Sequence, residues 1–582
     1  MHHRPWLASY PDGVPHTLEP YPEKSLYSIL ADAAAKFPNR PAISFRPPGA
    51  PMGKTLNYRD LERQVDQFSR VLASLGVQKG DRVGLILPNI PQYVIGYYAA
   101  LRLGAVVVGN NPLYTERELS HQLKDAGIEV VVVLENLYPK LGAIRDEVGV
   151  REVIVTRLSD FLPFPVSVLA PMKMKKDAHK KGEPWPPVPA DAKVRWWKDL
   201  MTGSYPAVEP VAVDAREDLA GLIYTGGTTG LSKGAMLTHR NLVSNVIQGR
   251  AWFPDLVDGA EAVLCVLPFF HSFGITVAMN IGIYMAAKLV LELQFDLKAT
   301  LASVQREKAT MFPGVSRIYI AVNESKETPN FDLTSIKACF SGAAPLPLAV
   351  AEKFESITGG AIVEGYGLTE TSPIASSNPI KGKRKAGTIG LPIPDTDFRC
   401  VDLDDWTKAM PPGEEGELII AGPQVMQGYF NRPDETDQVI KTDRDGKRWL
   451  LTGDIAKMDE EGYFSIVDRK KDMIIVSGFN VYPTDIEQVL YRHPKVQKAA
   501  VVGLPDETTG EAVKAYIVLK EGETATEDEI RSFVKDPKHG LTGYRAPKLI
   551  EFRDSLPDTT VGKVLRRVLV DEEKKKAEAK QG

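Results

Sequence analysis

The sequence is poor in cysteine, and its start carries no apolar leader. Only three cysteines, Cys265, Cys339 and Cys400, occur in 582 residues, and they are far apart. This excludes a disulfide framework and favours buried, reduced thiols in a cytoplasmic protein over a nucleophilic cysteine. The residues after Met1 do not form the apolar core of a signal peptide, so we expect none.

Long apolar runs and an excess of one charge are also lacking. The most apolar stretch, residues 275–291, is shorter than the ~20 residues of a membrane span and contains Asn280 and Lys288. We therefore predict a buried strand–helix–strand segment there. The net charge of −4 gives no indication of nucleic-acid binding, and no His or Cys residues have the spacing of a zinc site.

What is present indicates a multi-domain α/β protein. A chain of 582 residues is too long for one core. Between residues 82 and 134 the pattern alternates strand, helix, strand, helix, strand, and residues 115–118 have capping-box spacing. This predicts a parallel sheet covered on both faces. Residues 1–26 show no period and are expected to form an irregular arm.

The pattern changes beyond about residue 470. Helices are predicted after Tyr482 and Thr526, and the expected strands are residues 498–504, 512–519 and 548–552. These elements indicate a small α+β domain. The charged end, residues 572–581, is expected to fray.

Residues 161–197 differ in composition from their surroundings. An apolar part, Phe164 to Met172, is followed by several lysines, then by prolines and by the pair Trp196–Trp197. One interpretation is a solvated insertion. The other is an interfacial patch, with apolar groups at the lipid boundary and lysines attracted to anionic headgroups.

The stretch from Tyr224 to Gly234, Tyr-Thr-Gly-Gly-Thr-Thr-Gly-Leu-Ser-Lys-Gly, follows a predicted buried strand and precedes a predicted helix near His239. Glycines and threonines make a poor core, but their amides and hydroxyls can surround an anion, and Lys233 adds a positive charge. The Walker A pattern does not fit, because Ser232 stands where glycine is required. A plain surface turn remains an alternative for the loop by itself.

Further motifs accompany this loop along nearly the whole chain. They are Pro268-Phe-Phe-His-Ser-Phe-Gly274, Ser341-Gly-Ala-Ala-Pro-Leu346, Gly365-Tyr-Gly-Leu-Thr-Glu370, Leu451-Thr-Gly-Asp454, Asp468-Arg-Lys-Lys-Asp472, Ser477-Gly-Phe-Asn-Val-Tyr-Pro483 and Gly562-Lys563. Together they resemble the adenylate-forming superfamily of acyl-CoA synthetases, luciferases and adenylation domains. Within it, the sequence is most similar to bacterial long-chain fatty-acid–CoA ligases.

The resemblance implies a fold and a reaction. The expected fold is α/β, with a large multi-subdomain N-terminal adenylate-forming domain at residues 1–470 and a small, mobile α+β C-terminal domain at 471–582. A carboxylate would attack the α-phosphorus of ATP, giving an acyl-adenylate and pyrophosphate. The thiol of coenzyme A would then take the acyl group and release AMP. Because the carboxylate is already ionised, catalysis must come from positioning and charge stabilisation.

The resemblance assigns most site residues to the large domain. Glu370 and Thr225 are the expected Mg²⁺ ligands, Thr369 contacts the α-phosphate, and His271 forms a wall of the carboxylate pocket. By themselves, Lys233 could be merely solvated, His271 could be structural and Thr369–Glu370 could be a helix cap. The phosphate-binding residues are Thr225, Gly226, Gly227, Thr228, Thr229, Gly230 and Lys233, and the adenine-site residues are Gly342, Ala343, Ala344, Gly365, Tyr366 and Gly367.

Further assignments concern the ribose and the small domain. Asp454 and Arg469 would bind the ribose, Lys471 would be the hinge, and Lys563 would bridge the carboxylate and the α-phosphate. Gly478 would open the path of the pantetheine arm. Around Lys563 the motif departs from the usual pattern, with Asp558 and Val561 at positions that relatives usually fill with Lys and with Thr or Ser.

We therefore expect an ATP-dependent long-chain fatty-acid–CoA ligase that uses Mg²⁺ and is located in the cytoplasm. Peripheral contact with the anionic inner face of the cell membrane is one option. A homodimer is compatible with the sequence, which does not set the oligomeric state. The alternatives are a medium-chain or aryl acid–CoA ligase, a fatty acyl-AMP ligase loading a carrier protein, and a nucleotide-sensing or lipid-binding protein without turnover.

Overall fold

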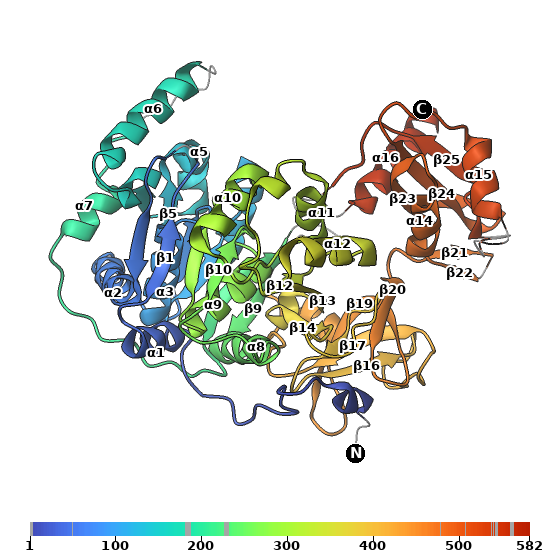
Figure 1. The fold of residues 1–582 in the computed structure, drawn as a ribbon, viewed down its shortest axis with the longest axis horizontal. Helices are drawn as coiled ribbons and strands as arrows, with labels where there is room; N and C mark the ends of the chain where they lie inside the picture. Colours follow the sequence, from blue (N-terminus) through green and yellow to red (C-terminus); the bar gives the residue numbers. More distant parts are fainter. Residues whose placement is uncertain are drawn as a thin grey trace. The chain divides into compact units, whose positions relative to one another are not determined.

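The computed structural model describes residues 4–48, 50–180, 188–225, 232–477, 479–506, 508–536, 538, 541, 545–558 and 564–581. The chain folds as two compact units (Figure 1). The first comprises Met1–Asp397 with Ala421–Leu450, and the second comprises Phe398–Ile420 with Leu451–Gly582. The predicted boundary at residue 471 falls inside the second unit, in a turn between two of its strands.

A largely parallel sheet forms one layer of the first unit. Within the described residues it has seven strands in the order β7-β6-β5-β3-β4-β8-β9, and only the β8–β9 pair is antiparallel. The strands are β3 (Arg82–Ile86), β4 (Val106–Gly109), β5 (Val130–Leu134), β6 (Glu152–Thr156), β7 (Val194–Trp196), β8 (Leu219–Thr225) and β9 (Lys233–Thr238). The predicted parallel sheet is confirmed.

Helices cover both faces of this sheet because its strands are apolar on both sides. Leu123 of α4 packs in one core with Val131 of β5, whereas Gly96 of α3 lies against Leu85 on the other face. The predicted capping box at residues 115–118 opens α4. The helices are α2 (Tyr58–Ser74), α3 (Pro91–Arg102), α4 (Glu116–Ala126), α5 (Tyr138–Val148) and α7 (Trp197–Thr202).

A second β layer of the first unit has the strand orders β10-β11-β1-β2 and β12-β13-β14-β15. Met311 joins them, because it pairs with both Val263 and Ala338. The strands are β1 (Pro41–Phe45), β2 (Lys54–Asn57), β10 (Ala262–Cys265), β11 (Lys288–Leu291), β12 (Ala338–Ser341), β13 (Ala361–Gly367), β14 (Ile374–Ser377) and β15 (Leu391–Pro392). The helices that accompany this layer are α1 (Ser28–Lys36), α8 (His239–Ala251), α10 (Leu297–Glu307), α11 (Ser316–Glu324) and α12 (Leu348–Thr358).

The segment before β11 differs from the prediction. In place of a strand, Gly274–Asn280 forms a π-helix that continues into α9 (Ile281–Tyr284). An apolar run that is buried on all sides, as this one is, does not distinguish helix from strand by its period. No helix in the described part of the chain is long and apolar enough to cross a membrane.

The three cysteines are free and buried, as predicted. Burial raises the pKa of all three thiols. Their reactive thiolate forms are therefore disfavoured at neutral pH, which agrees with a structural role.

The start of the chain is the predicted irregular arm, whose regular structure in the described residues is the 3₁₀ turn Pro5–Ser9. The Arg4 guanidinium lies 2.6 Å from the Asp397 carboxylate, a partner 393 residues later in the chain. The Leu18 amide and the Tyr21 hydroxyl both donate to Oδ2 of Asp395 at 2.8 Å. The arm therefore fastens the beginning of the first unit to residues 395–397.

His239 holds the end of this arm. The Leu26 amide donates to His239 Nδ1 at 2.9 Å, and the imidazole is fully buried. Its Nε2 has no hydrogen-bond partner among the described residues. Burial lowers the pKa of His239 to about 4, with Lys79 acting in the same direction and Asp218 opposing it.

We expect acid to destabilise the first unit through His239. An unfolded histidine titrates near pH 6.5, so between pH 6.5 and about 4 the unfolded chain binds more protons than the folded one. The free energy of unfolding should fall as the pH drops through this window, by up to about 3 kcal/mol. Urea unfolding of the wild type and of His239→Gln at neutral and acidic pH measures this. Equal losses of stability in the two proteins would contradict it.

The region between β6 and α7 separates into two parts. Trp197 is buried and stacks on Phe68 with ring centroids 4.1 Å apart, and the Arg157 guanidinium lies 3.8 Å from the Trp196 ring. The tryptophan pair therefore belongs to the body of the unit and not to an interfacial patch. The preceding helix α6 (Val166–Lys180) extends away from the sheet in Figure 1.

The second unit contains a small domain with the predicted α+β pattern. Its sheet has the order β22-β21-β24-β23, and β25 pairs with β24. The helices and strands that lie wholly or mainly in the second unit are β16 (Asp397–Val401), β17 (Gly416–Ala421), β19 (Arg448–Met458), β20 (Phe464–Arg469), β21 (Ile474–Val476), β22 (Phe479–Val481), α14 (Pro483–Tyr491), β23 (Val496–Asp506), β24 (Gly510–Leu519), α15 (Glu527–Lys535), β25 (Leu549–Phe552) and α16 (Arg566–Gln581). These confirm the three predicted strands.

The end of the chain is helical, which differs from the expected fraying. Charges on α16 find partners on the sheet: Glu573 lies 2.9 Å from Lys514, and Glu572 lies 2.7 Å from Arg553. A run of charges predicts solvation only when no oppositely charged surface is nearby, and the sequence does not show that surface.

Candidate active site

The predicted phosphate loop lies between β8 and β9. These strands pair antiparallel up to Thr225 and Lys233, which are therefore opposite each other at the mouth of the loop. Both residues are half-buried. The predicted phosphate-binding residues that lie outside the described part of the chain are Gly226, Gly227, Thr228, Thr229 and Gly230.

Lys233 is held in place by neighbouring side chains. It pairs with Glu435 of α13 (Pro433–Val439), and its Nζ lies 4.8 Å from the centroid of the Tyr429 ring. Only 20% of the side chain is exposed. The alternative of a merely solvated lysine is therefore wrong.

The other stem of the loop is anchored to the same stretch of chain. The Tyr224 hydroxyl donates to Asp125 Oδ2 at 2.7 Å, and Arg432 lies 2.8 Å from the other oxygen of that carboxylate. Residues 429–435 thus fasten both stems of the loop.

Thr369 and Glu370 lie in a 3₁₀ turn, η6 (Thr369–Thr371), that packs against β8 and β9. Glu370 Oε1 accepts a hydrogen bond of 2.6 Å from the Tyr429 hydroxyl. The hydroxyl oxygens of Thr369 and Ser272 are 3.3 Å apart. The fold thus brings the predicted metal ligand to the stems of the phosphate loop, and brings Thr369 to the motif that contains His271.

Close packing explains the glycines that flank Tyr366. A β-carbon at Gly365 would lie 2.0 Å from the Phe340 ring, and one at Gly367 would lie 1.8 Å from the Pro373 carbonyl oxygen. Tyr366 stands between them on β13 and is half-buried. Because side chains alternate along a strand, its ring points to the opposite face from the two crowded positions.

The loop after β12 carries Gly342, Ala343 and Ala344. Ala343 adopts a left-handed φ of 67° and is exposed. The Ser316 hydroxyl donates to the Pro345 carbonyl at 2.6 Å, and the Leu346 amide lies 3.2 Å from Glu364 Oε2. Small side chains on a fixed backbone leave room for a flat base. Burial raises the pKa of Glu364, directly before Gly365, to about 7.

His271 is exposed, whereas the aromatic residues around it are turned into the protein. Phe269 is buried against Tyr93, with centroids 5.5 Å apart, and Phe273 meets Phe340 edge-on at 5.8 Å. The role of His271 as a wall of the carboxylate pocket stays a prediction. The helical run that follows, residues 274–284, is almost entirely buried.

The predicted ribose pair lies in the second unit. Asp454 of β19 and Arg469 of β20 are directly opposite each other in the antiparallel ladder. The Arg469 Nε lies 2.7 Å from Asp454 Oδ1, and the carboxylate is nearly inaccessible, at 3% exposed. Strand register thus places two residues that are 15 positions apart side by side.

Lys471 is exposed in the turn that connects β20 to β21. Carboxylates near this turn share the guanidinium of Arg566, the first residue of α16. These carboxylates are Glu487 at 2.7 Å, Asp472 at 2.9 Å and Asp468 at 3.7 Å. The predicted residues Lys563 and Gly478 lie outside the described part of the chain.

The sequence did not point to Tyr429, Glu435 or Ser272. Tyr429 is 59 residues from Glu370, and a Tyr-Phe pair is unremarkable by itself. Ser272 lies next to His271 in a motif that the sequence did single out, so proximity to that motif was the available signal.

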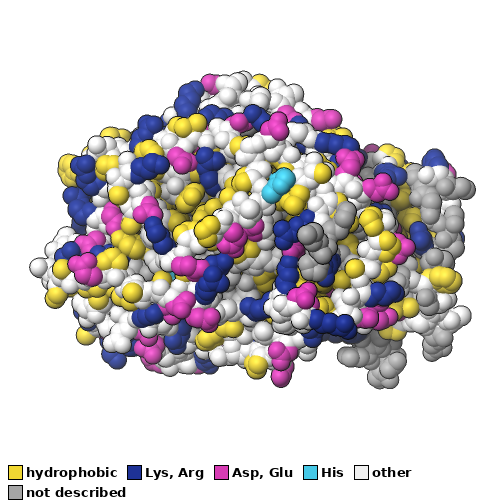
Figure 2. All heavy atoms as spheres, turned by 90° about the horizontal axis from the view of Figure 1, so that it is seen from below, with side chains coloured by type: hydrophobic (Ala, Val, Ile, Leu, Met, Phe, Trp, Pro, Cys, Tyr) yellow, Lys and Arg dark blue, Asp and Glu magenta, His cyan; other side chains and the backbone are white. Residues whose placement is uncertain are grey.

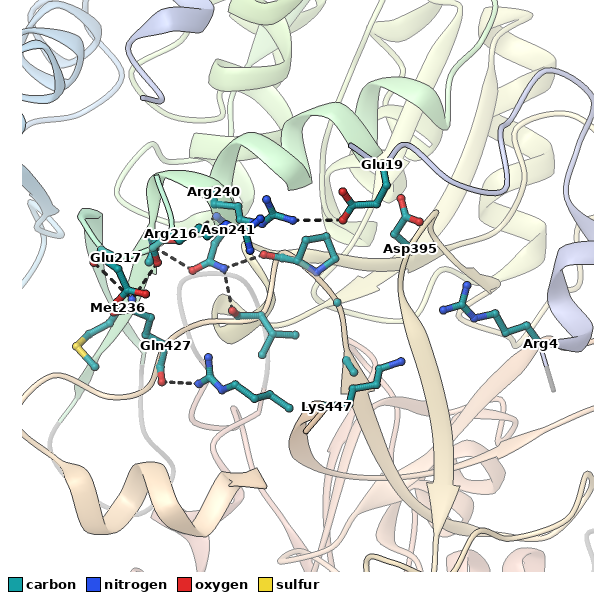
Figure 3. Close-up of a pocket in the computed structure, with 16 residues that line it drawn as sticks. Arg4, Glu19, Arg216, Glu217, Met236, Arg240, Asn241, Asp395, Gln427 and Lys447 are labelled. Carbon is teal, nitrogen blue, oxygen red and sulfur yellow. Dashed lines mark hydrogen bonds and ion pairs between the residues drawn. The ribbon is translucent and has the colours of Figure 1, made fainter. Parts of the chain in front are cut away.

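A separate open cleft of about 960 Å³ lies elsewhere in the first unit (Figure 3). Arg240 pairs with Glu19 of the arm at 3.2 Å, and the Asn241 amide donates to the Pro423 and Val425 carbonyls at 2.8 and 2.9 Å. None of the residues that line it is a predicted nucleotide-binding residue. The cleft therefore lies where the N-terminal arm, α8 and residues 421–448 meet.

Charges of both signs are interspersed over the face drawn in Figure 2, in keeping with the small net charge.

In the described part of the chain, no three His, Cys, Asp or Glu residues form a group that could hold a metal. Glu370, half-buried beside the phosphate-loop stems, nevertheless fits Mg²⁺, because this ion usually takes one or two protein carboxylates and completes its shell with phosphates and water.

Residues 30–430 match the family model of the AMP-binding enzymes, and residues 485–563 match the model of the AMP-binding enzyme C-terminal domain. The chain belongs to the AMP-binding enzyme family. The predicted superfamily, and the fold class with a large first domain and a small α+β C-terminal domain, are confirmed.

Curated relatives and a solved structure show which members of the family this chain is similar to. The chain is 44% identical to a long-chain-fatty-acid–CoA ligase of Bacillus subtilis strain 168 over 98% of both chains. It is 41% identical to a long-chain-fatty-acid–CoA ligase of Escherichia coli O6:H1 over 99% of both. The crystal structure of ATP-bound MatB from Rhodopseudomonas palustris has a TM-score of 0.79 and 30% identity, covering 94% of this chain and 98% of MatB.

Proposed function

We propose that this protein is an ATP-dependent long-chain fatty-acid–CoA ligase. In the first step, a carboxylate oxygen of the fatty acid attacks the α-phosphorus of ATP, and the bond to pyrophosphate breaks. In the second, the sulfur of coenzyme A attacks the acyl carbon, the bond to AMP breaks, and the thiol gives up its proton. The full-length likeness to ligases of this activity is the observation that carries the proposal.

The residues of the first unit act in the first step. In this proposal Thr369 contacts the α-phosphate, and Lys233 and the loop at 225–230 hold the outer phosphates. Glu370 and Thr225 hold Mg²⁺, which supplies charge neutralisation on the phosphates when bound. Tyr366 and the small residues at 342–344 receive adenine, and His271 borders the carboxylate.

The second unit supplies the ribose contacts and the change between steps. Asp454 accepts from the ribose hydroxyls, and Arg469 holds its carboxylate in place. The boundary between the domains is placed at Lys471, in the exposed turn, so that rotation there exchanges Lys563 for Gly478 and its neighbours. Lys563 supports adenylation, and Gly478 lines the path of coenzyme A.

Pyrophosphate release measured over a panel of short-, medium-, long-chain and aryl acids tests the function. Long-chain acids should give the highest kcat/KM, and acyl-CoA should form only with coenzyme A present. Faster turnover of an aryl or medium-chain acid would show that this acid, and not a long-chain one, is the substrate. Acyl transfer to a carrier protein but not to coenzyme A would show that the carrier protein is the acceptor. Absence of pyrophosphate release with every acid would contradict the proposal that the protein is an adenylate-forming enzyme.

We also propose that α6 rests on the anionic inner face of the cell membrane, where a long-chain acid partitions. Its lysines at 175, 176 and 180 are exposed and follow an exposed apolar part. The exposed fractions of that part are 81% for Phe164, 56% for Val168, 58% for Leu169 and 66% for Met172. Apolar groups beside lysines fit an interface with negatively charged headgroups.

Binding to vesicles of phosphatidylcholine with phosphatidylglycerol should depend on α6. The charge variant Lys175→Glu/Lys176→Glu and the apolar variant Leu169→Ser/Met172→Ser should both bind less, and salt should release the wild type, since charges are screened beyond ~10 Å at 0.1 M ionic strength. Lys298→Glu and Leu348→Ser, at exposed positions elsewhere, are the matched controls. Unchanged co-sedimentation of both α6 variants would favour the solvated insertion.

A further inference from the structure

We infer that Tyr429 is a positioning residue for the metal site: its hydroxyl orients the Glu370 carboxylate toward the mouth of the phosphate loop. The inference rests on the proposed function, because it takes Glu370 as the Mg²⁺ ligand. It stands on the hydrogen bond of 2.6 Å from the Tyr429 hydroxyl to Glu370 Oε1.

The chain around Tyr429 is fixed to both partners of the site. We call residues 426–430 the Tyr429 segment. Its main chain extends the hairpin beside β9, where the Met236 amide donates to the Gly428 carbonyl at 2.9 Å and the Phe430 amide donates to the Gly234 carbonyl at 2.8 Å. The Met426 amide donates to the Glu370 carbonyl at 2.9 Å. The segment therefore sets the distance between a phosphate-loop stem and Glu370.

The Tyr429 side chain touches both charges that the polyphosphate would meet. It is only 8% exposed, its hydroxyl holds Glu370, and its ring lies under the Lys233 ammonium. Its ring face thus supports the cation while its edge orients the anion.

A donor on one carboxylate oxygen restricts rotation of the Glu370 side chain and leaves Oε2 for the ion. Partners of this kind, which hold a ligand without touching the metal, typically change metal affinity or activity by 10–100-fold when removed. A tyrosine that only filled space would not need its hydroxyl. Tyr429→Phe removes that group alone and keeps the ring beneath Lys233.

Mn²⁺ serves as the probe, added to the whole protein with ATP and without fatty acid, and its binding is followed by water-proton relaxation. Tyr429→Phe should weaken Mn²⁺ binding about 10-fold. In pyrophosphate release it should raise the Mg²⁺ concentration for half-maximal rate, with kcat recovered at high Mg²⁺. Tyr58→Phe is the matched control, because it removes a buried hydroxyl that donates to the Ala287 carbonyl at 2.7 Å, outside the site.

A double-mutant cycle separates positioning from general packing. In a Glu370→Gln background, Tyr429→Phe should add little further loss of Mn²⁺ affinity, because the hydroxyl acts through the carboxylate. Equal losses in both backgrounds, or wild-type affinity in Tyr429→Phe, would overturn the positioning role and leave the proposed function standing. Wild-type affinity in Glu370→Gln itself would instead remove Glu370 from the metal site.

Discussion

Lys563→Ala should slow acyl-adenylate formation about 10²–10³-fold, which is the usual loss when one preorganised charge donor is removed from a transition state. Negative charge develops around the α-phosphorus as the carboxylate attacks, and the proposed role of Lys563 is to neutralise it. The second step does not need this charge. When pre-made acyl-adenylate is supplied, the variant should transfer the acyl group to coenzyme A at nearly the wild-type rate.

Rapid-quench measurement of each step separately checks this expectation. Lys574→Ala, at an exposed position of α16, is the control and should leave both steps unchanged. Lys471→Pro should show the opposite pattern from Lys563→Ala, because a fixed φ restricts the hinge turn and delays transfer. If Lys563→Ala and Lys471→Pro lose both steps equally while their thermal melts stay normal, domain alternation does not describe this chain.

Glu370→Gln should lower the rate of pyrophosphate release by ~10²-fold or more at ordinary Mg²⁺. Glutamine keeps the shape of the side chain and can still accept from the Tyr429 hydroxyl, but it lacks the negative charge that holds the ion. The polyphosphate would then be bound with its charge poorly compensated and its α-phosphorus misplaced.

Glu352→Gln on α12 makes the same chemical change at an exposed position and should have no effect. Both variants should melt at the wild-type temperature, because Glu370 is only half-buried and keeps its hydrogen bond. Near wild-type activity of Glu370→Gln across a Mg²⁺ titration would exclude it as a metal ligand.

Local signals in the sequence predicted much of the fold. The capping box at residues 115–118 marks the start of α4 and the glycine at 127 marks its end, as expected, because caps depend on neighbours within one turn. The strands on either side follow from continuous apolar runs. The prediction was wrong at residues 274–280, which form a π-helix, because burial on all sides removes the sequence period that distinguishes helix from strand.

The candidate site was predictable in its motifs and less so in its supports. Thr369, Glu370 and Lys233 stand in recognisable patterns, whereas Tyr429 and Glu435 reach them from a stretch some 60 to 200 positions away in sequence. Which side chain crosses such an interval depends on strand pairing, here between β9 and the Tyr429 segment. A single sequence does not contain that pairing in readable form.

During synthesis, the N-terminal arm cannot dock until the residues around 395–397 have been made. Arg4 and Asp397 are 393 residues apart, and Tyr21 needs Asp395. At a synthesis rate of 5–20 residues per second, the arm stays undocked for roughly 20–80 s after it is made. The chain then leaves the first unit at Asp397 and returns at Ala421, so the cleft beside α8 closes later still. Over that interval the apolar residues of the arm, such as the otherwise buried Trp6, lack their folded partners and form the kind of transiently exposed apolar surface on which chaperones act.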